Sequence, residues 1–254
     1  MKRFFMAFAA IVLFALSLTA CEKEIPIDDI WIKPASATMF VGETLNIDIQ
    51  YTPLEATNID EMEVYSTNES IITYSNGVVT AKDAGNAAIS AACGNVVGQC
   101  KVKVYRDKFQ KGNETFGIDY ASGHLYRMGL ASFQELDITL THQGANGMTQ
   151  NFKIWVTKEQ LGKDLDFTQP LFGLPFVGVY MNNNEDGYLV YGSSEGTPMI
   201  VTADWSFTDV TLKRGILRVD NIQDYRFKVH ADFELSNGYA FNTDWEGWVN
   251  MKEE

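Results

Sequence analysis

The segment GSSEG at residues 192–196 has the G-x-S-x-G spacing of a hydrolase nucleophile elbow, with Ser194 in the position of the nucleophile. That elbow places its serine on a tight turn between a buried strand and a helix, whose amino terminus helps to stabilise the oxyanion. Here the next residues, TPMIVTADWSF at 197–207, include a proline and several β-branched residues, which favour another strand. We therefore interpret Ser194 as a loop residue, and the sequence predicts no catalytic residue and no enzyme.

Paired carboxylates are a second arrangement that could do chemistry, because a glycoside hydrolase uses two carboxyl groups about 5 to 9.5 Å apart beside a sugar. Asp232 with Glu234, and Asp244 with Glu246, would each share one face of a strand. The chain has 33 acidic residues, so such pairs also arise by chance. A glycan hydrolase therefore ranks behind the non-catalytic functions.

The residues that bind metals in proteins are poorly grouped. His124, His142 and His230 lie in or beside predicted strands and lack the H-E-x-x-H spacing of a zinc site. The run NNNEDG at 182–187 offers oxygen ligands but not the alternating order of a calcium loop, and it falls between two predicted strands. We expect a hairpin turn there, and the sequence predicts no metal and no cofactor.

Cys93 and Cys100 lie in ISAACGNVVGQCKVKVY, whose two flanks alternate like the strands of a hairpin joined by GNVVGQ. In such a hairpin the two cysteines face each other, and we predict a disulfide if the protein is exported to an oxidising compartment. The alternative is two unpaired thiols, one or both of them buried. Two thiolates without a nearby histidine do not supply the four ligands of a structural zinc site.

Aromatic residues cluster in the second half of the chain, and aromatic rings beside polar groups are what carbohydrate-binding surfaces use. We predict that Trp248, Trp245, Tyr188 and Tyr191 bind a ligand. The alternative is that these large side chains fill the core of a β-sandwich. Trp245 and Trp248 fall on opposite faces of a strand, so at least one points outward unless a bulge at Gly247 intervenes.

Short alternating segments separated by Gly, Pro and Asn predict an all-β protein with two domains, residues 30–105 and 106–254. The clearest strand runs from Tyr225 to Leu235, where apolar and polar residues alternate strictly. A turn at Asn237-Gly238 joins this strand to YAFNTDWEGWV at 239–249 as a hairpin. TKEQLGK at 157–163 predicts a single helical turn. The second domain is expected to be an antiparallel β-sandwich or a barrel-like sheet.

Five features in chain order characterise the first domain: Pro34, VGET at 41–44, Pro53, GVVTA at 77–81 and GNAAI at 85–89. With these features, residues 30–105 resemble the group 2 bacterial immunoglobulin-like domain. The resemblance implies an immunoglobulin-like β-sandwich, which in such proteins acts more often as a spacer than as an adhesin. Tyr65 stands where the family usually has Trp, and we expect it to fill the same core position.

The end of the second domain contains GILRV at 215–219, the Asn237-Gly238 turn and WEGW at 245–248. In these features it is similar to uncharacterised all-β domains in lipoproteins of Bacteroides-type bacteria. Such domains have been labelled cell-adhesion proteins. The label describes an architecture more than a measured activity, so the resemblance implies a fold and a cellular context.

Residues 1–20 combine a basic start with an apolar run at 4–18, which is short for a membrane core of about 30 Å but typical of a secretory signal peptide. The ending LTAC at 18–21 resembles a bacterial lipobox, which implies that Cys21 is the lipid-attachment residue. The alternative is an ordinary signal peptide with Cys21 as a stray thiol. Residues 21–29 are expected to be an acidic tether, and Glu22-Lys23-Glu24 resembles the surface-export signals of Bacteroides-type lipoproteins.

The formal net charge of −13 disfavours binding to nucleic acid and to an anionic membrane surface, since both need basic patches. We expect a protein exported by the general secretory route and anchored by lipid in the outer membrane, at the cell surface. Its predicted role is adhesion or recognition without catalysis, with a glycan or a host-surface protein as ligand. The alternatives are an accessory glycan-binding lipoprotein of a polysaccharide-uptake system and, behind it, a glycan hydrolase.

Overall fold

The computed structural model of the 254-residue chain describes residues 24–127, 134–144, 146–182 and 186–253. The predicted signal peptide and Cys21 lie outside the described residues. Within the described ranges the chain consists of strands, connecting loops and two short 3-10 helices, so the all-β prediction is confirmed. No helix in these ranges is long and apolar enough to cross a membrane.

Packing divides the chain into two units. The first holds the described residues up to Ala37 together with Thr44–Thr80 and Ala87–Val102. The second holds Thr38–Glu43, Ala81–Asn86 and the residues from Lys103 onward. Most of the immunoglobulin-like strands therefore belong to one unit, and all strands after Tyr105 belong to the other.

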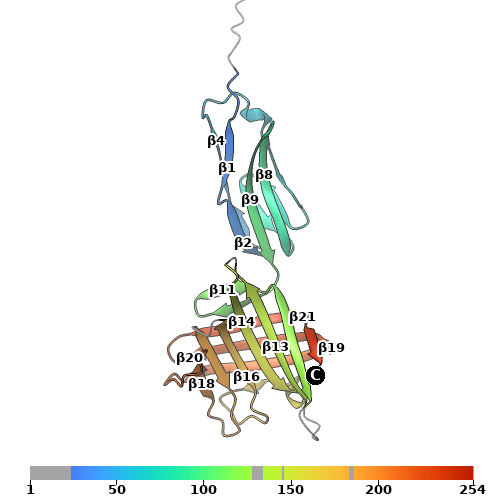
Figure 1. Cartoon of the computed structure of the whole chain (residues 1–254), viewed down its shortest axis with the longest axis vertical. Coiled ribbons are helices and arrows are strands. Elements are labelled where there is room, and N and C mark those ends of the chain that lie inside the picture. Colours follow the sequence, from blue (N-terminus) through green and yellow to red (C-terminus); the bar gives the residue numbers. More distant parts are fainter. Residues whose placement is uncertain (1–23, 128–133, 145, 183–185, 254) are drawn as a thin grey trace, which may run out of the picture. The chain divides into compact units, whose positions relative to one another are not determined.

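The immunoglobulin-like domain consists of nine strands in three groups (Figure 1, blue to green). β1 pairs with β4, β2-β9-β8-β5 form a four-stranded sheet, and β3-β7-β6 form a three-stranded sheet. The inward residues form the core, where Ile32, Ile72, Val79, Ile89 and Val102 are at most 2% exposed. The elements are β1 (Asp29–Lys33), β2 (Ser36–Phe40), β3 (Thr44–Asn46), β4 (Asp48–Thr52), η1 (Ile59–Glu61), β5 (Glu63–Ser66), β6 (Ile72–Ser75), β7 (Val78–Ala81), β8 (Gly85–Cys93) and β9 (Val96–Tyr105).

Cys93 and Cys100 are free thiols and both are buried, so the predicted disulfide is wrong. Cys93 ends β8, and a two-residue turn, Gly94-Asn95, leads directly into β9 at Val96. The connection is therefore shorter than the GNVVGQ segment that the sequence suggested. Cys100 lies four residues beyond Val96, and because a strand advances about 3.4 Å per residue, the two cysteines lie beyond the about 7 Å limit for a disulfide. Burial also raises the pKa of the Cys100 thiol, which makes it less reactive.

Two smaller expectations for this domain are also corrected. Tyr65 is 47% exposed and does not fill the core position that we assigned to it. The acidic tether predicted over 21–29 is too long, because Ile27 is only 4% exposed. The Ile25 N–H donates to Thr57 Oγ1 over 3.0 Å, and the Ile27 N–H donates to Asn58 Oδ1 over 2.9 Å. These apolar residues join the domain because burying them is favourable.

The second domain consists of two sheets of six and seven strands. The six-stranded sheet has the order β11-β10-β21-β20-β19-β15, and the seven-stranded sheet has the order β18-β17-β16-β14-β13-β12-β22. Among the described strands of this domain, neighbours pair antiparallel, except that β22 runs parallel to β12. The elements are β10 (Lys108–Lys111), β11 (Glu114–Gly117), β12 (Tyr120–Arg127), β13 (Gln134–Gln143), β14 (Thr149–Thr157), η2 (Lys158–Gln160), β15 (Leu165–Asp166), β16 (Phe176–Met181), β17 (Gly187–Tyr191), β18 (Met199–Thr202), β19 (Leu212–Gln223), β20 (Arg226–Leu235), β21 (Ala240–Trp248) and β22 (Asn250–Glu253).

One hydrophobic core fills the space between these two sheets, so the domain is a sandwich. Ile138, Phe152 and Val179 enter the core from the seven-stranded sheet, and Phe233 and Phe241 enter it from the six-stranded sheet; all five are fully buried. The strands of one sheet cross those of the other (Figure 1). The predicted hairpin through Asn237-Gly238 is present as β20 and β21, and the predicted helical turn is present as η2. Each sheet has one face on the core and one outer face, and these outer faces are where a site can form.

Candidate functional site

Four side chains form a row across the outer face of the seven-stranded sheet. Asp137 on β13 lies opposite Trp155 on β14, Trp155 lies opposite Phe176 on β16, and Phe176 lies opposite Tyr191 on β17. Directly opposed residues in antiparallel strands point to the same side of a sheet. The residues next to them along the strands, such as Ile138, Ile154, Val177 and Val190, belong to the core. The row therefore points away from the core.

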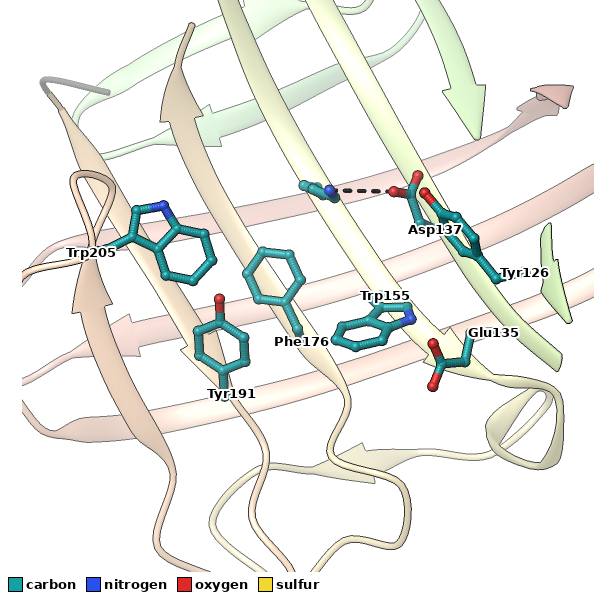
Figure 2. A pocket seen from close by; sticks show the side chains of 8 residues that line it. Tyr126, Glu135, Asp137, Trp155, Phe176, Tyr191 and Trp205 are labelled. Carbon is teal, nitrogen blue, oxygen red and sulfur yellow. Dashed lines mark ion pairs between the residues drawn. The ribbon is translucent and has the colours of Figure 1, made fainter. Parts of the chain in front are cut away.

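This row lines a hollow of about 330 Å³ (Figure 2). A second hollow of about 190 Å³ adjoins it and shares Lys153, Phe176 and Trp205 with it. We call the two hollows together the aromatic trough. Its lining residues are Tyr126, Glu135, Asp137, Lys153, Trp155, Phe176, Tyr180, Leu189, Tyr191, Ala203 and Trp205.

The aromatic rings of the trough rest on a small apolar cluster on the outer face. Phe176, Leu189 and Val201 are its buried members, and Trp155, Tyr180 and Tyr191 pack against them. Phe176 is 5% exposed and forms the floor, with its ring stacked on that of Tyr191 at a centroid distance of 4.9 Å. Figure 2 shows Phe176, Tyr191 and Trp205 side by side, with Trp155 and Tyr126 further along. The outer face thus presents a continuous aromatic surface.

Trp205 stands at one end of the trough on a tight turn. Its backbone has φ +70°, a left-handed conformation that is an outlier for a bulky residue. The Asp204 carboxylate holds the turn by accepting hydrogen bonds from the Thr202 hydroxyl and, over 3.1 Å, from the Ser206 N–H. The Trp205 N–H donates to the Thr202 carbonyl over 2.9 Å. Trp205 is 64% exposed, with its ring 6.2 Å from that of Tyr191, so the turn displays the indole without burying it.

Three charged residues line the trough. The Lys153 ammonium lies 3.3 Å from Asp137 Oδ2, and His124 Nδ1 lies 3.8 Å from Asp137 Oδ1. Among the described residues, the Glu135 carboxylate has no hydrogen bond or ion pair, although Glu135 is only partly exposed. Glu135 and Asp137 are two residues apart on one strand and therefore share its outer face. The trough thus contains one ion pair and one free acceptor.

The pKa values of Tyr180 and Tyr191 in the trough are raised, so their hydroxyls stay protonated to a higher pH than that of a free tyrosine. Burial raises the pKa of Tyr180, and the negative charge of Asp137 raises it further. Burial also raises the pKa of Tyr191. Both effects disfavour the phenolate. These two hydroxyls can therefore donate hydrogen bonds to a ligand at neutral pH.

The structure separates the four residues that we predicted to bind a ligand. Tyr191 lies in the trough, whereas Tyr188 points to the inner side of the same strand and contacts Tyr239 at a centroid distance of 4.9 Å. Trp245 is 6% exposed and belongs to the core, so the prediction that it contacts a ligand is wrong. Trp248 is 61% exposed but lies on β21, in the other sheet.

The residues whose spacing suggested catalysis do not form an active site, because they lie in a turn or in ion pairs. Ser194 lies in a turn between β17 and β18 with no helix after it, so the nucleophile elbow is not formed. Asp232 and Glu234 both pair with Arg214. The second carboxylate pair is also engaged, since Asp244 and Glu246 pair with His230 and Arg226. The described residues contain no group of three His, Cys, Asp or Glu that could hold a metal ion.

Sequence reasoning missed most of the trough. The sequence patterns assign no role to Asp137, Trp155 or Phe176, although Trp155 carries a signal. Phe152 and Ile154 are buried in the core, so Trp155 falls on the opposite, outward face of β14. An outward tryptophan becomes informative when other apolar side chains join it, because contiguous exposed apolar patches mark binding surfaces.

Comparison with known proteins identifies the first domain. Residues 26–104 match the family model of the bacterial Ig-like domain (group 2), which confirms the resemblance for this part of the chain. No curated protein matches the chain. One similar solved structure is that of the S-layer protein SbsC, domains 5-6, which covers 89% of this chain and 98% of that chain at 11% identity with a TM-score of 0.27. A similarity this weak carries no argument about the second domain.

Proposed function

We propose that the protein is a lipid-anchored cell-envelope protein that recognises a glycan through the aromatic trough without catalysis. Its predicted position is the outer membrane, at the cell surface. The immunoglobulin-like domain serves as a spacer between Cys21 and the second domain. The second domain carries the binding site.

A single observation carries the glycan proposal: aromatic rings and a free carboxylate lie together on an outer sheet face. Trp205 and the half-buried Trp155 and Tyr191 offer apolar faces, against which the C–H groups of sugar rings can pack. Glu135 offers an acceptor for sugar hydroxyl groups, and the Tyr180 and Tyr191 hydroxyls offer donors. A mostly apolar pocket with a few polar groups is the usual form of a small-molecule site.

The carboxylates of the trough favour binding over hydrolysis. A glycoside hydrolase needs two carboxyl groups free to act as acid and as base or nucleophile. Asp137 is instead 8% exposed and engaged by Lys153 and by His124. Glu135 alone cannot supply both roles. We therefore propose recognition, and a chain that released sugar from any bound glycan would contradict this part of the proposal.

Glycan binding serves adhesion and also capture for polysaccharide uptake, which is the alternative function. The trough is compatible with both, since each requires a glycan to bind and be released unchanged. The two functions differ in the phenotype of a gene deletion. Loss of attachment to a glycan-coated surface supports adhesion, whereas loss of growth on a polysaccharide supports capture.

The binding proposal is tested on a glycan array with the full chain and two matched variants. Trp205 and Trp248 are 64% and 61% exposed, but Trp205 lines the trough and Trp248 lies on the other sheet. We expect Trp205→Ala to weaken binding at least about tenfold, because tryptophans at binding sites often contribute more than 1.4 kcal/mol. We expect Trp248→Ala to bind as the unmodified chain does. Equal losses in both variants would place the binding site elsewhere.

The anchor is tested separately by Cys21→Ala. Acyl chains on Cys21 would hold the protein on the membrane by burying their hydrocarbon, and removing the cysteine removes their point of attachment. We expect the variant in the soluble fraction of disrupted cells and the unmodified chain in the membrane fraction. A Cys21→Ala protein that stays with the membrane would show that the anchor lies elsewhere.

A further inference from the structure

The aromatic trough runs across the strands, and this direction limits the shape of a ligand. The row from Asp137 to Tyr191 crosses β13, β14, β16 and β17. Neighbouring strands lie about 4.8 Å apart, so the row alone spans about 14 Å. Tyr126 on β12 and Trp205 after β18 extend the lined surface at its two ends. One strand spacing is comparable to the length of one pyranose unit, so the trough fits at least three consecutive rings.

Neighbouring rings of the trough are in contact with each other. Phe176 and Tyr191 are stacked with an interplanar angle of 22°, and Tyr191 and Trp205 are tilted at 37°. These rings follow one another along the trough as an apolar surface (Figure 2). A surface of this kind suits an extended chain that contacts several side chains in sequence, more than a compact ligand enclosed on all sides.

The charges of the trough disfavour an anionic ligand. Lys153 is its cation among the described lining residues, and its ammonium already pairs with Asp137. Glu135 adds a negative charge at the same site, and no described residue forms an ion pair with it. A uronate or sulfate group placed there would meet a like charge, which costs affinity in a partly desolvated site. The net charge of −13 adds repulsion at long range.

We infer that the aromatic trough binds an extended glycan without anionic groups, of at least three sugar rings, that lies across the strands. This inference rests on the proposed function, since it names the class of glycan that the same site takes. The inference predicts that polyanionic glycans of host or bacterial origin bind more weakly than neutral ones. An adhesion function by itself makes no such prediction.

The test compares oligosaccharides that differ in charge and share a backbone. The full chain is titrated calorimetrically with β-1,4-linked cellohexaose and its glucuronate counterpart, and with β-1,4-mannohexaose and its mannuronate counterpart. We expect a neutral member to bind at least tenfold more tightly than its uronate counterpart, and the disaccharide of the same series to bind more weakly than the trisaccharide.

Two variants separate a local effect of charge from a global one. Glu135→Gln removes the free carboxylate of the trough, and Glu234→Gln makes the same charge change on the outer face of the other sheet. We expect Glu135→Gln to reduce the discrimination against the uronate hexamers at least threefold, and Glu234→Gln to leave it unchanged. Equal effects of both variants would assign the discrimination to net charge and overturn the local part of the inference.

The outcomes distinguish this inference from the proposed function. Tighter binding of a uronate counterpart than of its neutral partner overturns the inference and leaves glycan recognition standing. Equal affinity for the disaccharide and the hexasaccharide overturns the extended site. Binding of no member of this panel and of no glycan on the array overturns the proposed function, and the inference falls with it.

Discussion

The second domain has two outer sheet faces that differ in what fills them. On the six-stranded sheet, outward residues of β19, β20 and β21 form ion pairs, such as Arg214 with Asp232 at 2.7 Å and Arg226 with Glu246 at 2.6 Å. On the seven-stranded sheet, outward residues of β14, β16 and β17 are Trp155, Phe176 and Tyr191. Both sheets bury their other faces in the same core.

This difference shows where the domain departs from what folding alone requires. An outer face of paired charges keeps a sheet hydrated and contributes little to stability, because exposed ion pairs are weak. An outer face with a cluster of aromatic residues leaves apolar surface in water, which soluble proteins rarely do without a ligand or partner. The left-handed backbone of Trp205 fits the same interpretation, because strained residues concentrate at functional sites.

The largest expected difference between the two faces concerns their ion pairs. Lys153→Met leaves Asp137, which is 8% exposed, without its ammonium partner, and we expect the free energy of unfolding to fall by about 1 to 3 kcal/mol. Arg214→Met breaks the contacts of an exposed side chain, and we expect a smaller loss that shrinks further in high salt. Denaturant unfolding at low and high salt measures both. Equal and equally salt-dependent losses would contradict this distinction.

The next effect concerns the backbone of Trp205. Asparagine adopts the left-handed conformation more readily than alanine, so we expect Trp205→Asn to be more stable than Trp205→Ala by about 1 kcal/mol. At Trp248, in strand β21, we expect the asparagine variant to be no more stable than the alanine variant, because asparagine is disfavoured in strands. Thermal unfolding of the four variants gives the result. A higher stability of alanine at residue 205 would show that its backbone is relaxed.

The smallest expected effect is a pH dependence of folding stability that arises from a tyrosine of the trough. The pKa of Tyr180 is raised above its ordinary value of about 10, so above pH 10 the folded chain keeps a proton that the unfolded chain loses. Stability from this group is therefore complete below pH 10 and falls as the pH rises further. Asp232 raises the pKa of Arg214 on the other face. The ion pair between these two residues therefore persists over the same pH range.

The measurement is thermal unfolding between pH 8 and pH 11 for the unmodified chain and for Tyr180→Phe. Phenylalanine cannot ionise, so we expect a shallower fall in stability above pH 10 for the variant. The curves should run parallel between pH 8 and pH 9. Parallel curves over the whole range would show that Tyr180 ionises as readily in the folded chain as in the unfolded one.

Much of the fold could be predicted from the sequence because strands leave a local pattern. In β20, Phe227, Val229, Ala231 and Phe233 alternate with polar residues, and the structure buries all four. The Asn237-Gly238 turn marked the hairpin that follows. The first domain was identified by turn residues at fixed places, and its family model matches residues 26–104.

Most of the site could not be predicted from the sequence, because it depends on the register between strands. Trp155 lies 21 residues before Phe176, and Phe176 lies 15 residues before Tyr191; two strand pairings make them neighbours. The prediction of a disulfide is wrong for a related reason. The alternation around Cys93 and Cys100 was correct, but the position of the turn at Gly94-Asn95 set the register and kept the cysteines apart.

The sequence by itself determined that the chain is all-β, that its first domain is immunoglobulin-like and that alternate residues of each strand face inward. These properties follow from local backbone geometry, since side chains alternate with a period of two whatever the partner strand is. Tertiary structure alone decided which outward residues meet. The pairing of β13, β14, β16 and β17 placed Asp137, Trp155, Phe176 and Tyr191 in one row, because a shift of one residue in any pairing would have turned its side chains to the other face.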